Sequence, residues 1–292
     1  KFWDSQPSIA DDGKTLYSPA AGISELRMAA TEWMNKTYQT AYEIKNTLVT
    51  CGGKFGIFTA IQAFVKPSEE VIIISPYWVS YPSIVRLFNA KPVFVSTIEK
   101  DGWKIDLEKI KNAITPKTKM LIINNGSNPT GVLYSRDELS GILRLAAEHN
   151  FLVLSDEVYS GLAYDGDYIS VGSFSEFSDR VLVIQSCSKH FAMTGWRVGL
   201  VFGHESAIKI LTSIQSQRTT GTSSISQWAA LAAIANAAEI MSFVKKEMKE
   251  RRDIFIDIFN QLFHAELAKP AAGLYSFFSL LSLGVRETDS VD

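Results

Sequence analysis

An α/β doubly wound fold with a mostly parallel sheet is predicted by three features of the sequence. Short apolar runs alternate with stretches of helical length and pattern along most of the chain. The apolar runs are hydrophobic throughout, as at 71–74 and 181–184, which is typical of parallel strands buried on both faces. Several runs end in a polar residue, and open α/β sheets bind ligands beyond the carboxyl ends of their strands.

The first half of the chain alternates helices and strands in the order that this fold requires. Ser24 and Glu25 are placed to cap the first helix. Tyr17 lies in the loop before it, where a tyrosine more often anchors packing than binds a ligand. The expected elements are helices at 24–36, 55–65 and 106–113, and strands at 47–50, 70–75, 91–96 and 119–125.

The second half continues the alternation and ends in long helices. Ser135 and Glu138 have the spacing of a capping box, which predicts that a helix begins there. The last helix is expected to lead onward to a second domain. The expected elements are strands at 151–155, 181–184 and 198–203, and helices at 135–150, 205–217, 226–237 and 239–263.

Lys189 is the residue around which the chemistry of this sequence is arranged. It follows the apolar run 181–184, so it is expected just beyond the carboxyl end of a buried strand. Burial of an amine favours its uncharged form, which attacks a carbonyl to form an imine. Ser186, Ser188 and Arg197 supply hydroxyls and a fixed cation, which are groups that anchor a phosphate. The stretch therefore predicts a site for an aldehyde cofactor with a phosphate tail.

A pair of glycines follows the strand expected at 47–50. Gly52 and Gly53, with Lys54, separate this strand from a helix, so backbone N–H groups at the helix start can face an anion. The sequence has neither the phosphate loop of nucleotide hydrolases nor the G-x-G-x-x-G spacing of dinucleotide-binding proteins. The glycines therefore indicate either a phosphate cradle or a plain tight turn.

Aromatic or polar groups also follow three other expected strands. The cluster at 76–82, Pro-Tyr-Trp-Val-Ser-Tyr-Pro, offers either a ring face for a flat ligand or packing for the core. Asn128 precedes Pro129 in a turn, where a cis peptide bond would aim the Asn128 amide into the cleft. Asp156 ends the next strand, and an acid at this place is suited to pair with a protonated ring nitrogen.

The composition argues against several classes of function. The 292 residues are 46% hydrophobic, which is enough for one large domain and a smaller one. The net charge is −2 with basic residues evenly spread, so no nucleic-acid or membrane partner is expected. Cys51 and Cys187 are the only cysteines, too few for a disulfide framework or a zinc site, and no run approaches the roughly 18 apolar residues of a membrane helix. We therefore expect small-molecule partners and a cytoplasmic location.

Six motifs stand in one order along nearly the whole chain. They are Tyr17, Gly52-Gly53-Lys54, Pro76-Tyr77-Trp78, Asn128-Pro129-Thr130-Gly131, Asp156-Glu157-Val158-Tyr159, and Ser186-Cys187-Ser188-Lys189 with Arg197. In order and spacing this set resembles the class I/II aminotransferases, which are pyridoxal-phosphate enzymes of the aspartate aminotransferase fold, PLP fold type I. The resemblance implies pyridoxal 5′-phosphate as the cofactor.

The resemblance implies a chemical role for four residues. Lys189 would bind the cofactor aldehyde covalently and, once released by substrate, carry a proton between the substrate Cα and the cofactor. Asp156 would pair with the pyridinium nitrogen and keep it protonated. Tyr159 and Asn128 would donate hydrogen bonds to the ring hydroxylate. Lys189, Asp156 and Tyr159 are therefore the expected catalytic residues.

Other matching residues would hold the cofactor in place. Trp78 would stack on its ring, and Tyr17 would reach the phosphate of the neighbouring subunit, so that a complete site needs a homodimer. The phosphate itself would be bound by the backbone N–H groups of Gly53 and Lys54 together with Ser186, Ser188 and Arg197.

The sequence departs from the family at its two ends. Family members carry an arginine near the C-terminus that binds the substrate α-carboxylate, and an N-terminal arm that closes over the substrate. We find no counterpart of either and expect that segments are missing at both ends. Residues 273–277 resemble the start of the family's small α+β domain, so we expect a large cofactor-binding domain at 1–245 and an incomplete small domain at 246–292.

The loops at 14–22 and 76–82 most resemble those of prokaryotic-type aspartate aminotransferases. This suggests aspartate and 2-oxoglutarate as substrates, while an aromatic amino acid could use the tryptophan and tyrosine wall equally well. Lys189, Asp156 and Tyr159 would carry the exchange of the amino group by a ping-pong course. Lys54 and Arg218 are the candidates to bind the distal carboxylate of such a dicarboxylate substrate.

Three other functions share some of these features with an aminotransferase. A carbon–sulfur β-lyase, or another α,β-eliminating enzyme on the same fold, would share the whole cofactor set, and the reaction depends on which Cα bond is held perpendicular to the ring. A regulatory module without catalysis would have lost Lys189, Asp156 or Asn128, and all three are present. A nicotinamide oxidoreductase would need the dinucleotide fingerprint loop, which is absent.

Overall fold

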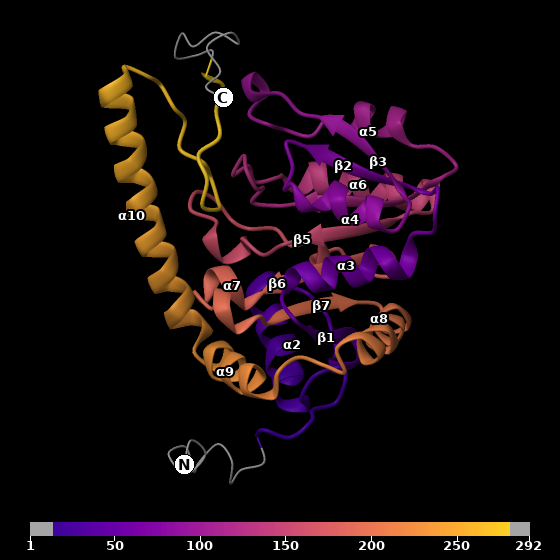
Figure 1. Cartoon of the computed structure of the whole chain (residues 1–292). Coiled ribbons are helices and arrows are strands. Elements are labelled where there is room, and N and C mark those ends of the chain that lie inside the picture. The colour runs from indigo at the N-terminus through magenta and orange to yellow at the C-terminus, as the bar shows by residue number, and fades with distance from the viewer. Residues whose placement is uncertain (1–13, 281–292) are drawn as a thin grey trace.

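The computed structural model describes residues 14–280 and has one sheet at its centre (Figure 1). The strands are β1 (Thr47–Thr50), β2 (Glu70–Ser75), β3 (Lys91–Ser96), β4 (Thr118–Asn124), β5 (Leu152–Asp156), β6 (Val181–Ser186) and β7 (Gly199–Gly203). Their order in the sheet of this region is β1-β7-β6-β5-β4-β2-β3. Strands β3, β2, β4, β5 and β6 are mutually parallel, whereas β7 runs antiparallel to β6 and to β1. The predicted α/β fold with a mostly parallel sheet is confirmed.

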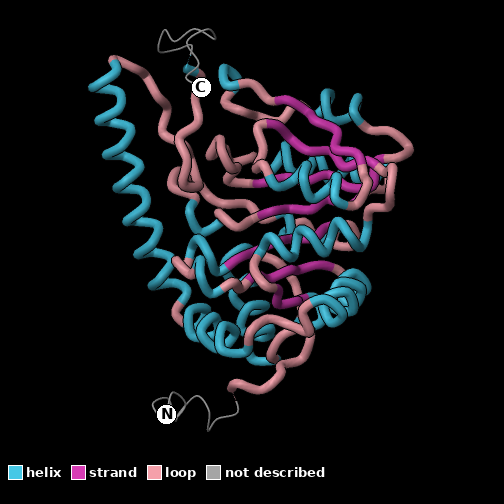
Figure 2. Tube along the Cα trace, in the orientation of Figure 1, coloured by secondary structure: helices cyan, strands magenta, loops and turns pink. Residues whose placement is uncertain are grey.

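Helices cover both faces of the sheet, which gives three layers (Figure 2). One face packs against α2 (Ser24–Tyr38), α5 (Leu107–Ala113), α6 (Arg136–His149) and α9 (Ser224–Ala235). The other face packs against α3 (Gly53–Phe64), α4 (Ser80–Leu87) and α8 (Glu205–Arg218). The sheet therefore separates two hydrophobic cores.

The continuous apolar runs follow from this burial on two faces. In β6, Val181 and Val183 enter one core while Leu182 and Ile184 enter the other, and all four are at most 3% exposed. Full burial of such a side chain contributes about 1.5–3 kcal/mol to folding. A polar residue on either face of a central strand would lose that contribution. This explains why the polar residues of β5 and β6 lie at or next to the carboxyl ends of these strands.

The predicted helices begin and end within two residues of the observed ones, but α4 and the short helix α7 (Cys187–His190) were not predicted. Helix α4 was not predicted because 76–82 was interpreted as an aromatic cluster, but Pro82 lies in the first turn of this helix, where its missing N–H is tolerated. The expected cap at Ser24 is wrong, since the N-cap of α2 is Ile23 without a side-chain cap. Gln227 Oε1 of α9 instead accepts the Ile23 N–H at 2.8 Å. The predicted capping box of Ser135 in α6 is confirmed.

The long helix α10 (Ala237–Phe263) runs along one side of the molecule, and the chain after it returns toward the carboxyl ends of the strands (Figure 1). Arg252 of α10 donates to the backbone oxygen of Pro270 at 2.8 Å and pairs with Asp165. Ala272 then forms an antiparallel bridge with Ala163. The predicted domain boundary at 245/246 falls inside α10 and stays a prediction.

Two further observations concern residues 14–280. No single helix in this range is long and apolar enough to cross a membrane. Helices α9 and α10 taken together have sufficient length and apolar composition, but they are bent by 84° relative to each other. In the same range no group of three or more His, Cys, Asp or Glu is arranged to hold a metal ion.

Candidate active site

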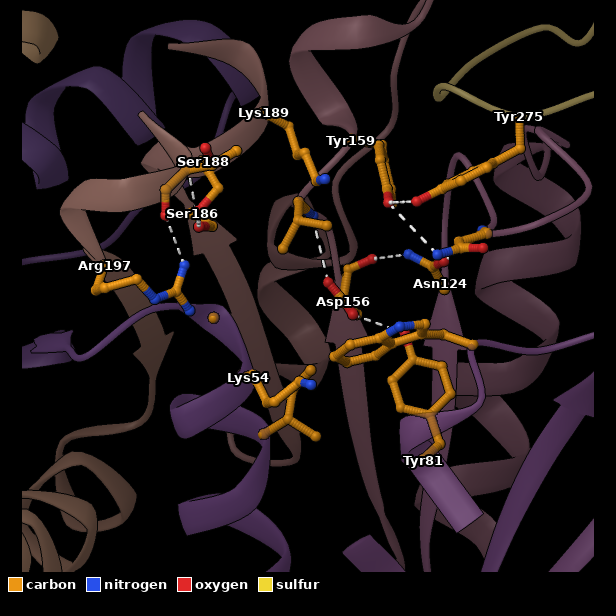
Figure 3. Close-up of a pocket in the computed structure, with 16 residues that line it drawn as sticks. Lys54, Tyr81, Asn124, Asp156, Tyr159, Ser186, Ser188, Lys189, Arg197 and Tyr275 are labelled. Carbon is orange, nitrogen blue, oxygen red and sulfur yellow. Dashed lines mark hydrogen bonds between the residues drawn. The ribbon is translucent and has the colours of Figure 1, made fainter. Parts of the chain in front are cut away.

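A cavity of about 270 Å³ lies at the carboxyl ends of β4, β5 and β6 (Figure 3). Ten of the eleven residues predicted for the site line it together. They are Gly53, Lys54, Trp78, Asn128, Asp156, Tyr159, Ser186, Ser188, Lys189 and Arg197. Their roles toward a cofactor stay predictions, but their common location agrees with one site.

The start of α3 is held against β7 and Arg197 by glycines. Gly52, the N-cap of α3, has φ 87°, and a Cβ on it would lie 2.5 Å from Nη2 of Arg197. A Cβ on Gly199 of β7 would lie 2.5 Å from the backbone nitrogen of Gly53. Any side chain at either position would displace the guanidinium or the helix start. The glycines thus form a cradle at a helix N-terminus, where backbone N–H groups favour an anion.

Hydroxyls from the turn after β6 complete this cradle. Ser186 caps the short helix α7 (Cys187–His190), since its Oγ accepts the backbone N–H of Ser188 at 3.2 Å. The Oγ atoms of the two serines lie 3.0 Å apart. Arg197 donates from Nη1 to the Thr194 oxygen at 2.9 Å, which fixes its guanidinium beside them. One fixed cation, two hydroxyls and a helix N-terminus are a donor set that fits a phosphate monoester. We call these groups the anion cup: the start of α3 with Ser186, Ser188 and Arg197.

Asp156 supplies a buried acid at the end of β5. Asp156 is only 3% exposed, and this burial raises the pKa of its carboxyl group from 3.8 to about 6. Tyr81 donates to Oδ2 at 2.6 Å and the Val158 N–H to Oδ1 at 3.4 Å, and both bonds hold the pKa lower than burial alone would. No ion pair among the described residues involves Asp156. A cationic ring nitrogen would supply the missing partner.

Asn124 ties the Asn128 turn to the end of β5. Its Nδ2 donates to the Asp156 backbone oxygen at 2.8 Å, and its Oδ1 accepts the Asn128 N–H at 2.7 Å. The peptide bond between Asn128 and Pro129 is cis, as the sequence indicated. Asn128 Nδ2 lies 3.5 Å from the hydroxyl oxygen of Tyr159 and donates to it. The amide therefore points into the cavity beside the phenol.

Two amines enter the cavity from different elements. Lys189, in the short helix α7, places Nζ 5.7 Å from the centre of the Tyr159 ring. Lys54, in the first turn of α3, places Nζ 4.7 Å from the centre of the Trp78 ring. The Trp78 ring is held edge-on to Tyr81, with centroids 5.4 Å apart and an interplanar angle of 87°. The cavity thus has one amine near the phenol and another near the indole.

Tyr17 is the predicted site residue that the structure does not bring to this cavity. It is 94% exposed and lies in a groove with residues 219–225. Arg218, the other candidate for a distal carboxylate, stacks over Phe58 at 5.2 Å and does not line the cavity either.

Six lining residues were missed by sequence reasoning. Tyr81 lies in the aromatic cluster that supplied only Trp78, and Asn124 is a polar residue at the end of an apolar strand, so both had a signal. Tyr275 reaches the cavity only because the chain returns after α10, which no local pattern indicates. The six are Ile57, Tyr81, Asn124, Val158, Thr194 and Tyr275.

Glu157, next to Asp156, is a second buried acid with different surroundings. Its Oε1 accepts from Ser155 Oγ and from the Val171 N–H, each at 2.9 Å, whereas its Oε2 has no partner. Burial raises its pKa from 4.5 to about 7. It does not line the cavity.

The sequence matches the family Aminotransferase class I and II over residues 4–284. The chain belongs to this family. This aminotransferase is 36% identical to a probable aspartate/prephenate aminotransferase of Thermus aquaticus over 283 residues, which cover 96% of the chain and 73% of the relative. It is 41% identical to the aspartate/prephenate aminotransferase of Thermus thermophilus over 248 residues, or 84% of the chain and 64% of the relative.

Solved structures agree with the sequence relatives. The aminotransferase resembles an aspartate aminotransferase from Thermus thermophilus with maleate at a TM-score of 0.87 and 37% identity, over 92% of this chain and 70% of that one. The aminotransferase therefore has PLP fold type I. Membership of the family also implies that pyridoxal 5′-phosphate is its cofactor. The relatives are named aminotransferases, so the β-lyase alternative is not favoured.

The residues that line the cavity of this aminotransferase fit the phosphate, the ring nitrogen and the aldehyde of pyridoxal 5′-phosphate. The anion cup fits the phosphate, the buried carboxylate of Asp156 fits the ring nitrogen, and the amine of Lys189 lies in the same cavity to meet the aldehyde. Trp78 offers a ring face.

Proposed function

We propose that this aminotransferase exchanges the amino group between L-aspartate and 2-oxoglutarate in a ping-pong course. The observation that carries the proposal is the presence of Lys189, Asp156 and Lys54 in one cavity: a reactive amine, a buried acid and a second cation. The names of its relatives, aspartate and aspartate/prephenate aminotransferases, support the substrate class.

The chain's own residues divide the work of binding and proton transfer. Bound pyridoxal phosphate supplies the electron sink for the Cα–H bond of the amino acid. Asp156 holds a proton at the ring nitrogen, because a buried carboxylate without another cation is stabilised by that charge. Asn128 and Tyr159 orient the ring by donating to its hydroxyl oxygen, and the anion cup fixes the phosphate.

Lys189 acts as the general acid and base. Once free, its Nζ would remove the proton from the substrate Cα and deliver a proton to the cofactor side. The amino group would stay with the cofactor, and water would supply the oxygen of the departing oxo acid. The second substrate, an oxo acid, takes up the amino group by the same steps in reverse. This role is supported by the position of the Lys189 amine, which lies in the same cavity as the Asp156 carboxylate and the Tyr159 phenol.

Lys54 is the residue we propose for the distal carboxylate of the substrate. Its Nζ lies over Trp78 inside the cavity, whereas Arg218 lies outside it on Phe58. A carboxylate in a partly buried site gains about 1.5–3 kcal/mol from a charge-assisted hydrogen bond. The relative from Thermus thermophilus was solved with maleate, which is a dicarboxylate.

The working unit we propose is a homodimer in which Tyr17 reaches the phosphate site of the neighbouring subunit. Tyr17 is 94% exposed and separate from the cavity of its own chain, which supports a role across an interface rather than within the subunit.

A substrate panel tests the proposed function. The protein is loaded with pyridoxal phosphate, and kcat/KM is measured for aspartate, phenylalanine and alanine against 2-oxoglutarate. Aspartate is expected to be best, and each amino acid alone should convert the cofactor absorbance from the aldehyde to the amine form. If phenylalanine or alanine exceeds aspartate by more than about tenfold, roughly 1.4 kcal/mol in transition-state binding, the aspartate assignment is wrong. Release of ammonia without that conversion would contradict transamination itself.

A further inference from the structure

Tyr275 brings a third polar group to the end of the cavity that Asn128 and Tyr159 occupy. Its hydroxyl oxygen lies 3.5 Å from that of Tyr159, which donates to it, and the rings meet edge-on with centroids 6.3 Å apart (Figure 3). Asn128 Nδ2 donates to the same Tyr159 oxygen at 3.5 Å. The three side chains come from three separate segments of the chain, so their meeting results from tertiary structure alone.

The segment that carries Tyr275 is fixed to the loops that carry the other two residues. Tyr164 donates its hydroxyl to the Gly273 oxygen at 2.6 Å, and the Gly273 N–H donates to the Leu162 oxygen at 3.1 Å. The Ala272 N–H donates to the Gly131 oxygen at 2.9 Å. Tyr275 therefore follows a segment, residues 272–273, that is fixed by hydrogen bonds to both loops, and this limits the positions that its hydroxyl can take.

The number of protons on the two phenols decides what Tyr275 can do. A tyrosine hydroxyl has one proton to donate and accepts through its oxygen. When the proton of Tyr159 is given to another acceptor, Tyr275 can remain bonded to Tyr159 only as the donor. Both contacts to Tyr159 are long at 3.5 Å, and such bonds tighten when a ligand completes the site.

We propose that Tyr275 is a positioning residue that donates its hydroxyl proton to the oxygen of Tyr159, so that the proton of Tyr159 is directed at the ring oxygen of the bound cofactor. The inference rests on the proposed contact between Tyr159 and that ring oxygen. A phenol that accepts one hydrogen bond is a stronger donor of the next, because the bonds polarise one another. Tyr275 then stabilises the ionised ring oxygen without touching it.

The test is a pH titration of the absorbance of the protein loaded with pyridoxal phosphate, since its midpoint reports how strongly the ionised ring oxygen is stabilised. Tyr275→Phe removes the hydroxyl and keeps the ring. Its midpoint is expected to move upward by roughly half a pH unit, the size expected when cooperative strengthening of one charge-assisted bond is lost. Tyr77→Phe is the matched control, because Tyr77 packs on Phe94 at 5.0 Å and does not line the cavity. Its midpoint should equal that of the wild type.

A double-mutant cycle separates this role from a structural one. In a Tyr159→Phe background the further change Tyr275→Phe should leave the midpoint unchanged, because the group through which Tyr275 acts is gone. An unchanged or lowered midpoint in Tyr275→Phe alone overturns the inference, as does an equal shift in the Tyr159→Phe background. If the wild type binds pyridoxal phosphate and Tyr275→Phe has the same titration midpoint, this inference is wrong while the proposed function stands. Failure of the wild type to bind the cofactor overturns both.

Discussion

Tyr81 donates a 2.6 Å hydrogen bond to Oδ2 of Asp156, and the two residues are only 2% and 3% exposed. The phenol comes from α4 in a helix layer and the acid from the end of β5 in the sheet, so the two layers meet at this end of the cavity. Burial raises the pKa of Asp156 to about 6, and this bond opposes the rise. Tyr81 thereby keeps a buried acid ionised near neutral pH.

Tyr81→Phe is expected to raise the pKa of Asp156 above its present value of about 6, because the lost bond stabilised the carboxylate. A bond to a charged group is worth about 1.5–3 kcal/mol, or roughly one to two pKa units. The measurement is NMR titration of protein labelled with carboxyl-¹³C aspartate, with the signal assigned by Asp156→Asn. Tyr77→Phe, which alters a phenol outside the cavity, should leave the signal alone. An unchanged pKa in Tyr81→Phe contradicts the assigned role.

Lys189→Ala should abolish the borohydride-trapped covalent cofactor while free pyridoxal phosphate still binds. The anion cup does not depend on the amine, since its groups come from α3, the β6–α7 turn and Arg197. Mass spectrometry after reduction, together with equilibrium dialysis of the cofactor, measures the two effects separately. Lys54→Ala is the control that keeps the covalent cofactor. Trapping of the cofactor at another lysine in Lys189→Ala would remove the central assignment.

Lys54→Gln should lower kcat/KM for aspartate by about 10- to 100-fold, the size of one charge-assisted bond. The loss for alanine, which has no distal carboxylate, should be much smaller. Arg218→Gln is the matched control, because Arg218 packs on Phe58 away from the cavity, and its kinetics should equal those of the wild type. If the two amino acids lose activity equally in Lys54→Gln, the amine serves the cofactor rather than the substrate.

Mixed dimers of Tyr17→Phe and Lys189→Ala subunits test the role of Tyr17 across an interface. If Tyr17 serves the neighbouring subunit, one site of each mixed dimer carries both changes and the other site carries neither. The untouched site should bind cofactor and turn over like the wild type, so mixing restores activity that both parents lack or have reduced. The readout is activity and cofactor content of dimers isolated with two different tags. If mixing gives only the average of the parents, Tyr17 acts within its own subunit.

The stability of the cofactor-free protein should fall as pH rises between about 4.5 and 7. In this window folded Glu157, with its pKa raised to about 7, retains a proton that the unfolded chain releases near 4.5. Asp156 contributes in the same direction between 3.8 and about 6. Glu157→Gln should flatten its part of this slope and stabilise the protein at pH 8 by on the order of 1–3 kcal/mol. The amide oxygen of the variant can still accept the bonds from Ser155 Oγ and the Val171 N–H that Oε1 accepts. Urea unfolding at pH 5 and pH 8 measures the difference, and a variant less stable at pH 8 would contradict this account.

The strands and the polar groups at their ends were predictable because both are local. An apolar run such as 181–184 has to be buried on two faces, and the residue that follows it has to lie at the sheet edge. The capping box of Ser135 was predictable for the same reason, since its two partners are three residues apart.

Contacts between distant segments were not predictable from local patterns. Nothing near Tyr81 indicates Asp156, and nothing near Tyr275 indicates Tyr159, because each pair meets only after the sheet has assembled. The expected cap at Ser24 failed in the same way, as Gln227 from α9 takes the Ile23 N–H. Helix α4 was missed because 76–82 was interpreted as an aromatic cluster, although Pro82 lies in the first helical turn, which accepts proline.

The contact of Gly199 with Gly53 has a consequence for how the protein acquires its cofactor. The start of α3 and strand β7 are far apart in the chain, so their contact exists only when a long loop of chain is closed, which costs conformational entropy. A chain in which β7 is not paired has the helix N-terminus but not the surface that positions it, so it is expected to bind phosphate less well. Phosphate binding is therefore expected to report that β7 has joined the sheet beside the start of α3.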